Sequence, residues 1–156
     1  MNEDFEQLLT TLTQHDVQFL LVGGVALGIH GLQRATGDID IWSKPDATNA
    51  QRIHDALREF GMPLAAFDVT PRDFATPGRV VQFGVPPRRV DVITSIEGVE
   101  FDEAWNSRAD MTVAGCRVPV ISLTDLLRNK EAVGRPQDKV DVLTIRRELE
   151  RRGQGR

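Results

Sequence analysis

The sequence predicts an α/β protein, in which helices pack on a mixed β-sheet and a helical pair follows at the C-terminal end. Two observations predict this class. Short apolar or alternating runs, which are typical of strands, occur between stretches with apolar residues at helical spacing. After about residue 121, only the helical spacing remains. Such an order is typical of one sheet covered by helices. We expect a single domain over residues 1–156, with a core at about 1–121 and a helical extension at about 122–152.

The first sixty residues contain strands and helices in alternation. We expect helices over residues 3–14 and 25–31, a third helix that opens at residues 44–46 and stops at Gly61, and strands over residues 17–22 and 38–42. Gly23-Gly24 ends the first strand. The segment Asp38 to Trp42 alternates polar and apolar residues with a period of two, the pattern of a half-buried strand.

The remaining elements follow from turn and cap signals. We expect a strand at residues 64–68, strands at 79–84 and 88–94 around a turn at 84–87, a short helix at 101–107, and a hairpin of 111–113 and 117–121. Two helices then follow. Ser122 can cap the first, and Pro136 lies near the start of the second.

Composition is that of an ordinary soluble protein, with 40% hydrophobic and 27% charged residues among 156. No apolar run reaches the ~20 residues that cross a bilayer, so we expect no membrane partner. The acidic N-terminus lacks the basic segment of a secretory signal. Cys116 is the only cysteine and has no internal disulfide partner, which fits a reducing compartment. We therefore expect a cytoplasmic location.

The net charge of −4 argues against a surface built wholly to bind nucleic acid. Five arginines nevertheless lie between Arg146 and Arg156. They could contact RNA or another anionic partner. They could equally form a solvated helix face, because cations are favoured near a helix C-terminus.

Asp38 and Asp40 are the first candidate functional pair. Residues two apart on a strand leave the same face, so these carboxylates would repel one another unless a cation lies between them. Mg²⁺ prefers oxygen ligands and often takes one or two carboxylates together with substrate phosphates. Asp91 lies in a second alternating run, and would join the pair if the two strands are neighbours. Three carboxylates suffice to bridge two metals. Alternatively, an Asp-x-Asp pair is simply a solvated strand face.

Gly23 and Gly24 lie between a predicted strand and a predicted helix. Glycine lets the backbone approach a phosphate closely, and a helix N-terminus offers free N–H groups. A tight turn without a ligand is the alternative. Together with the carboxylates, the segment predicts a phosphate site that faces a metal site.

These segments resemble those of the DNA polymerase β-type nucleotidyltransferase superfamily. The resemblance lies in Leu20-Leu21-Val22-Gly23-Gly24, Asp38-Ile39-Asp40-Ile41 and Val90-Asp91-Val92, in that order. Two further segments are similar to small bacterial members, including the abortive-infection toxin type. They are His30-Gly31-x-x-Arg34-x-Thr36-x-Asp38 and Lys130-x-x-x-x-Arg135-Pro136-x-Asp138-Lys139-x-Asp141.

The resemblance implies a nucleotidyltransferase fold, a nucleoside triphosphate substrate and Mg²⁺ or Mn²⁺. It implies that Asp38 and Asp40 bind both metals, that Asp91 binds the metal that activates the incoming hydroxyl, and that Gly23 and Gly24 hold the triphosphate. Many members have Ser where this chain has Gly24, so a phosphate contact is lost there. The acceptors implied are RNA 3′ ends, proteins and small molecules. A toxin role with an antitoxin partner is implied in the same way.

Further nucleotide-binding candidates flank these segments. Arg34, with Thr36 beside it, could bind phosphate as a bidentate fork or be a surface arginine. Lys130 and Arg135 could reach the triphosphate, with Asp138 orienting one of them, or form a local salt bridge.

The sequence thus predicts metal-dependent transfer of a nucleoside monophosphate to an acceptor hydroxyl. Two alternatives remain, a non-catalytic nucleotide- or partner-binding module on the same fold, and a purely structural α/β protein.

Overall fold

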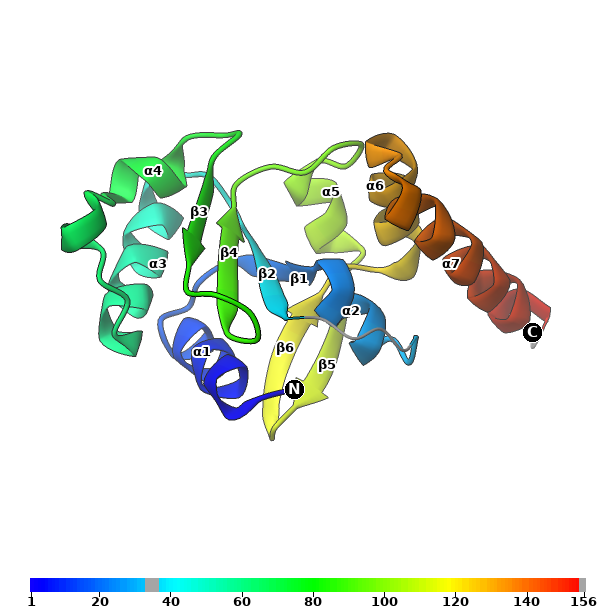
Figure 1. Ribbon diagram of the computed structural model, residues 1–156, viewed down its shortest axis with the longest axis horizontal. Helices are drawn as coiled ribbons and strands as arrows, with labels where there is room; N and C mark the ends of the chain where they lie inside the picture. The colour runs from blue at the N-terminus through cyan, green and yellow to red at the C-terminus, as the bar shows by residue number, and fades with distance from the viewer. Residues whose placement is uncertain (33–36, 155–156) are drawn as a thin grey trace.

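A mixed β-sheet lies at the centre of the computed structural model, which describes residues 1–32 and 37–154 and has six strands within those ranges (Figure 1). The order across the sheet is β3-β4-β2-β1-β6-β5. The strands are β1 (Phe19–Val22), β2 (Asp38–Ser43), β3 (Val80–Phe83), β4 (Arg89–Ile93), β5 (Ala109–Val113) and β6 (Cys116–Val120). β1 pairs parallel with β6 and antiparallel with β2, β2 pairs parallel with β4, and the two outer pairs are antiparallel.

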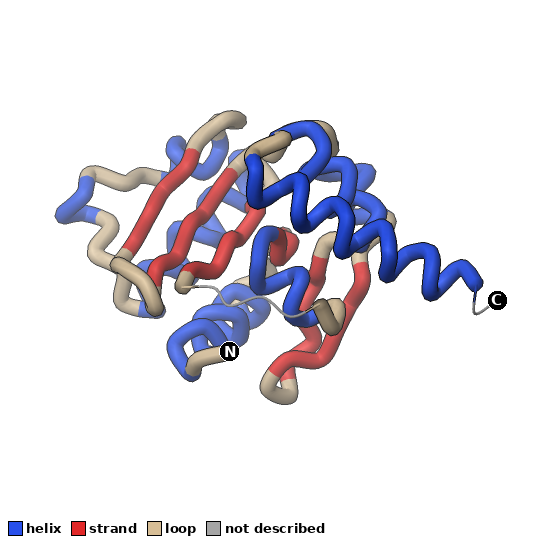
Figure 2. The backbone as a smooth tube through the Cα atoms, turned by 45° about the vertical axis from the view of Figure 1, so that its right-hand side comes forward, coloured by secondary structure: helices blue, strands red, loops and turns tan. Residues whose placement is uncertain are grey.

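Helices surround this sheet (Figure 2). They are α1 (Glu3–Gln14), α2 (Gly23–Ile29), α3 (Ala47–Phe60), α4 (Pro71–Ala75), α5 (Phe101–Asn106), α6 (Leu123–Val133) and α7 (Pro136–Gln154). The expected class, a mixed sheet with packed helices and a C-terminal helical pair, is confirmed.

Capping residues set the ends of three helices. The side chains of Asn2, Asp46 and Ser122 accept hydrogen bonds from backbone N–H groups in the first turns of α1, α3 and α6. Gly61 ends α3 in the left-handed conformation, with a φ of 107° that glycine adopts without a steric cost. The caps of α3 and α6 and the stop at Gly61 match the sequence signals.

The central strands position the acidic residues. Ile39 and Ile41 are fully buried, while Asp38 and Asp40 lie on the opposite face of β2 and are half-buried. In the sheet register, Asp40 pairs with Val22 of β1 on one side and with Asp91 of β4 on the other. Strand alternation and this register together place all three aspartates on one face.

The C-terminal pair approaches the same region. α6 packs against α7, whose last turns extend beyond the sheet (Figure 1). The loop after β4 is held tightly on α6: a Cβ added at Gly98 would lie 2.8 Å from the Cβ of Ala132. The Asn129 amide donates to the Glu97 carbonyl at 3.0 Å. α6 therefore lies beside the loop that follows the strand carrying Asp91.

Three details differ from expectation. Residues 64–68 form no strand; Ala65–Phe67 is a short 3₁₀ helix, and Asp68 has a φ of 54° that ends it. Of these residues only Leu64 is buried, so the segment has no alternating face to pack. The helix expected from residue 25 begins at Gly23, because its φ of 70° turns the chain directly from strand to helix. α4 had no counterpart among the expected elements. No helix in the described ranges is long and apolar enough to span a membrane.

Candidate active site

Three carboxylates converge at the middle of the sheet. Asp38, Asp40 and Asp91 each offer a ligand oxygen, and these oxygens lie within 4.8 Å of one another. Asp38 and Asp40 are half-buried and Asp91 is buried. The sheet thus brings together the acidic residues that the sequence predicts as metal ligands.

Electrostatic repulsion in this cluster falls most clearly on Asp40. Burial, together with the charges of Asp38 and Asp91, raises the pKa of Asp40 to about 7, and the Lys130 charge opposes this shift only in part. In its protonated form, Asp40 can donate a hydrogen bond to Asp91. A proton therefore relieves the crowding of negative charge, and a cation would relieve it too.

Asp91 also contacts a cation that the sequence interpretation did not assign to the site. Arg89 Nε donates to Asp91 Oδ1 at 3.0 Å, and Arg89 Nη2 donates to Asp91 Oδ2 at 2.9 Å. This bidentate hydrogen bond raises the pKa of the Arg89 guanidinium. The sequence spacing already indicates that Arg89 and Asp91 lie close together, because residues two apart on a strand share a face.

Gly23 makes room for this cluster. Its φ is +70°, a conformation that other residues adopt at a cost, and an added Cβ would lie 2.2 Å from Asp40 Oδ2. The glycine at this position therefore fits both the turn from β1 into α2 and the close approach of the Asp40 carboxylate.

A cavity of about 620 Å³ lies in front of the carboxylates. Gly23 and Gly24 line one part of it, and the three aspartates and Arg89 line another. A further part of the wall comes from the loop after β4 and from the C-terminal pair, through Ile96, Glu97, Asn129, Lys130, Val133 and Arg135. Ile96, Asn129 and Val133 were not foreseen, because their approach depends on how α6 docks.

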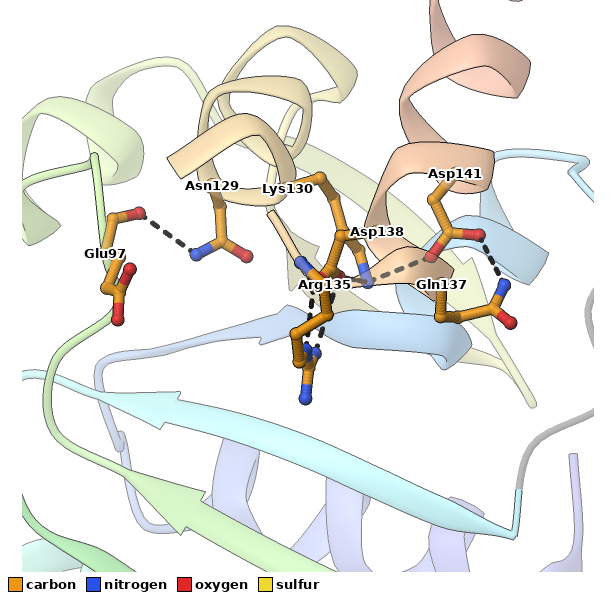
Figure 3. Close-up of polar contacts among 7 residues, drawn as sticks. All are labelled: Glu97, Asn129, Lys130, Arg135, Gln137, Asp138 and Asp141. Carbon is orange, nitrogen blue, oxygen red and sulfur yellow. Dashed lines mark hydrogen bonds and ion pairs between the residues drawn. The ribbon is translucent and has the colours of Figure 1, made fainter. Parts of the chain in front are cut away.

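Lys130 and Arg135 share one carboxylate (Figure 3). Lys130 Nζ lies 3.2 Å from Asp138 Oδ1 and 3.1 Å from Asp141 Oδ2, and all three residues are buried. Arg135 Nε donates to Asp138 Oδ2 at 2.7 Å, while its side chain remains 71% exposed. Burial alone would raise the pKa of Asp138, but hydrogen bonds from Arg135 and Lys130 lower it. Asp138 thus orients both Lys130 and Arg135 at the cavity wall, whereas the sequence predicted that it orients one of them.

Two predicted nucleotide-binding residues, Arg34 and Thr36, lie outside the described residues. The C-terminal arginines are largely paired within the chain: Arg146 with Glu131, and Arg151 and Arg152 with Glu148. Arg152 Nη2 also donates to the His30 carbonyl at 3.1 Å. These pairs favour a solvated helix face over a surface for RNA.

The donor set fits a hard divalent cation. All three ligands are carboxylates, their oxygens are close enough to share ions, and the pKa of Asp40 is raised by the neighbouring negative charges that a cation would neutralise. Asp38, Asp40 and Asp91 are the residues that would hold it.

Comparison with solved structures agrees with this architecture. A Thermotoga maritima protein, provisionally described as a nucleotidyltransferase, superposes with a TM-score of 0.57 at 17% identity, over 94% of this chain and 91% of its own. ANT(2″)-Ia, solved in complex with adenylyl-2″-tobramycin, superposes with a TM-score of 0.53 at 15% identity, over 90% of this chain and 84% of its own. At these identities the likeness shows the fold. No curated protein sequence matches the chain.

The sequence itself matches a family model over residues 1–147, nearly the whole chain. That family is described as nucleotidyltransferase of unknown function (DUF6036). The chain belongs to this family and is a nucleotidyltransferase.

Proposed function

We propose that the protein transfers a nucleoside monophosphate from a nucleoside triphosphate to an acceptor hydroxyl, with release of pyrophosphate, in a reaction that depends on Mg²⁺ or Mn²⁺. The observation that carries this proposal is the convergence of Asp38, Asp40 and Asp91, with their ligand oxygens within 4.8 Å, at a cavity that Gly23 and Gly24 also line.

In this proposal the three carboxylates hold the cations between the triphosphate and the acceptor. Bound there, divalent cations would neutralise phosphate charge and lower the pKa of the attacking hydroxyl. Gly23 and Gly24 offer backbone N–H groups to the phosphates without a side chain in the way. Arg135 extends an exposed guanidinium into the same cavity, held by Asp138, and Lys130 adds a second positive charge. The chain's main role is then to position charged groups.

The same proposal assigns nucleotide contacts to Arg34 and Thr36, on the resemblance of their segment alone. We place the whole activity in one domain, because the cavity wall contains residues of the core and of the helical extension alike.

The acceptor belongs to one of three classes: an RNA 3′ end, a protein side chain or a small molecule. ANT(2″)-Ia, whose structure contains adenylyl-2″-tobramycin, supports the small-molecule class through the shared fold. The internal pairing of Arg146, Arg151 and Arg152 removes much of the support for RNA.

A biochemical assay tests the central proposal. The full chain is incubated with Mg²⁺, each nucleoside triphosphate in turn, and total RNA, a protein lysate or a panel of aminoglycosides, and pyrophosphate release is measured. We expect release that EDTA abolishes and that the double variant D38N/D40N lacks. The matched control is D110N, because Asp110 is an exposed residue of the edge strand β5 that pairs with Arg108 and does not line this cavity. Turnover by D38N/D40N at the wild-type rate would refute the mechanism, and triphosphate binding without turnover would favour a non-catalytic module.

A toxin role extends the proposal, on the resemblance to abortive-infection toxins. Induced expression in a bacterial host should then arrest growth, and D38N/D40N should relieve the arrest. Arrest that persists in the double variant would separate toxicity from nucleotidyl transfer. An antitoxin would be sought as a co-expressed protein that restores growth.

A further inference from the structure

Arg89 binds Asp91, the one buried carboxylate of the acidic cluster, and lines the cavity in front of it. It lies two residues before Asp91 on β4, so both side chains leave the same face of the strand. Its Nε and Nη2 atoms contact the two oxygens of Asp91 at 3.0 and 2.9 Å. In the register of β2 and β4, Arg89 also lies directly beside Asp38. The guanidinium is therefore a cation among the three predicted metal ligands.

This arrangement occupies Asp91 on both oxygens. A planar guanidinium that binds side-on takes one lone pair of each carboxylate oxygen. A hard cation that coordinates Asp91 must use another lone pair of the same oxygens, and it then brings positive charge to within a few ångströms of the guanidinium. Repulsion between the two positive charges therefore sets the bidentate contact against coordination of a cation by Asp91.

We propose that Arg89 is a positioning residue that holds Asp91 until a divalent cation arrives, and that it exchanges this carboxylate for a phosphate group when the nucleotide binds. The proposal rests on the proposed function, since it assumes a cation at Asp91. The Arg89 side chain is 36% exposed and lines the same cavity as Gly23 and Gly24, so it can leave Asp91 without crossing the core.

Such an exchange makes cation and nucleotide binding mutually dependent. Without a nucleotide, the cation must displace the guanidinium from its bidentate contact with Asp91, and no phosphate is present to take the place of that carboxylate. With a nucleotide, the displaced guanidinium can bind a phosphate oxygen as a fork. The cation should therefore bind weakly alone and more tightly with nucleotide, and Arg89 should account for part of that difference.

A fixed structural salt bridge predicts the opposite sign. If Arg89 only orients Asp91 for coordination, its removal should weaken cation binding. If it competes for Asp91, its removal should strengthen binding in the absence of nucleotide.

The test measures Mn²⁺ binding to the full chain in the absence of nucleotide. Electron paramagnetic resonance monitors the concentration of the free ion. For R89Q we expect a dissociation constant about five- to tenfold lower than for the wild type, as the loss of a partly exposed charge-assisted contact allows. The matched control is R88Q, which removes the same charge from the neighbouring residue; Arg88 is exposed and pairs with Asp4 at 2.8 Å. R88Q should stay within about twofold of the wild type, because exposed charges are screened. R89K, which keeps the charge and loses the fork, should lie between the wild type and R89Q.

A second titration adds a non-hydrolysable triphosphate analogue. The wild type should gain more Mn²⁺ affinity from the analogue than R89Q does. Mn²⁺ binding by R89Q and R89K that is equal to or weaker than binding by the wild type would overturn the proposed exchange. The proposed function would still stand if the wild type binds Mn²⁺ and D38N/D40N does not. Failure of every variant to bind Mn²⁺, with or without the analogue, would overturn both.

Discussion

A Cβ added to Gly23 would lie 2.2 Å from Oδ2 of Asp40, closer than non-bonded heavy atoms approach. The first residue of α2 and the second aspartate of β2 are therefore fitted to one another. The proposed phosphate site and the proposed metal site share this contact, so a change in one should be felt in the other.

Replacement of Gly23 by Ala should impair transfer more than stability. The φ of +70° and the contact with Asp40 should together cost about 1–3 kcal/mol of unfolding free energy, measured by urea denaturation. Displacement of Asp40 should also lower kcat/KM for the triphosphate by more than about tenfold, as expected when a ligand to a metal is misplaced. The control is G28A on the same helix, where no atom lies within 4 Å of an added Cβ. G28A should keep its activity, and equal activity in G23A would contradict the proposed contact.

Stability should fall as pH rises between about 4 and about 7 when no divalent cation is present. The pKa of Asp40 is about 7 in the folded chain against 3.8 ordinarily, so the folded state holds a proton that the unfolded state has lost in this range. Because the folded state binds more protons there, the free energy of unfolding decreases as pH increases. Mg²⁺ should reduce the loss by replacing the proton.

Urea denaturation at pH 5, 6, 7 and 8, in EDTA or in Mg²⁺, measures this effect. Burial lowers the pKa of His30, which gives an opposite slope below its ordinary value of 6.5. The comparison with D40N therefore isolates the Asp40 contribution, and identical pH profiles for D40N and the wild type in EDTA would rule it out.

Lys130 should matter for stability as well as for the site. K130M would leave two buried aspartates, Asp138 and Asp141, without their shared cation. Breaking a buried ion pair in this way costs about 3–5 kcal/mol, which urea denaturation would resolve. R128Q on the same helix is the control, since Arg128 is exposed and lies 3.6 Å from Asp125. Its loss should cost less than about 1 kcal/mol. A K130M protein as stable as R128Q would mean that the aspartates find other partners.

Arg135 should act chiefly on nucleotide binding. Its side chain is 71% exposed, and Asp138 retains Lys130 when the guanidinium is removed. For R135Q we expect a change in unfolding free energy below about 1 kcal/mol. The dissociation constant for a non-hydrolysable triphosphate with Mg²⁺ should rise about tenfold, as the loss of a charge-assisted contact implies. Calorimetric titration measures it, and unchanged affinity would limit Arg135 to a structural role.

The sequence predicts those parts of the site that depend on local periodicity. Alternation in 38–42 and 89–93 is enough to place Asp38 and Asp40 on one face and to set Asp91 apart from Val90 and Val92. That β2 and β4 are parallel neighbours, with Asp40 opposite Asp91, is a non-local fact that no spacing encodes. The convergence of the three aspartates therefore follows from the pairing of β2 with β4, and not from the spacing within either strand.

Other features of the structure could not be predicted from local sequence patterns, because they also depend on contacts between distant segments. The contact of Gly98 with Ala132, and the hydrogen bond from Asn129 to Glu97, depend on how α6 docks. The segment 64–68 has strand-like apolar residues, yet it lies on the surface and coils into a 3₁₀ turn, because burial on a neighbouring sheet face is what makes such a segment a strand.

Lys130 joins α6 to α7 through Asp138 and Asp141 while also facing the cavity. Ligand affinity and the docking of the last helix are consequently linked quantities, because each alters the environment of the same ammonium group. Amides of α7 should then exchange with deuterium more slowly in the presence of triphosphate, although that helix extends well away from the sheet.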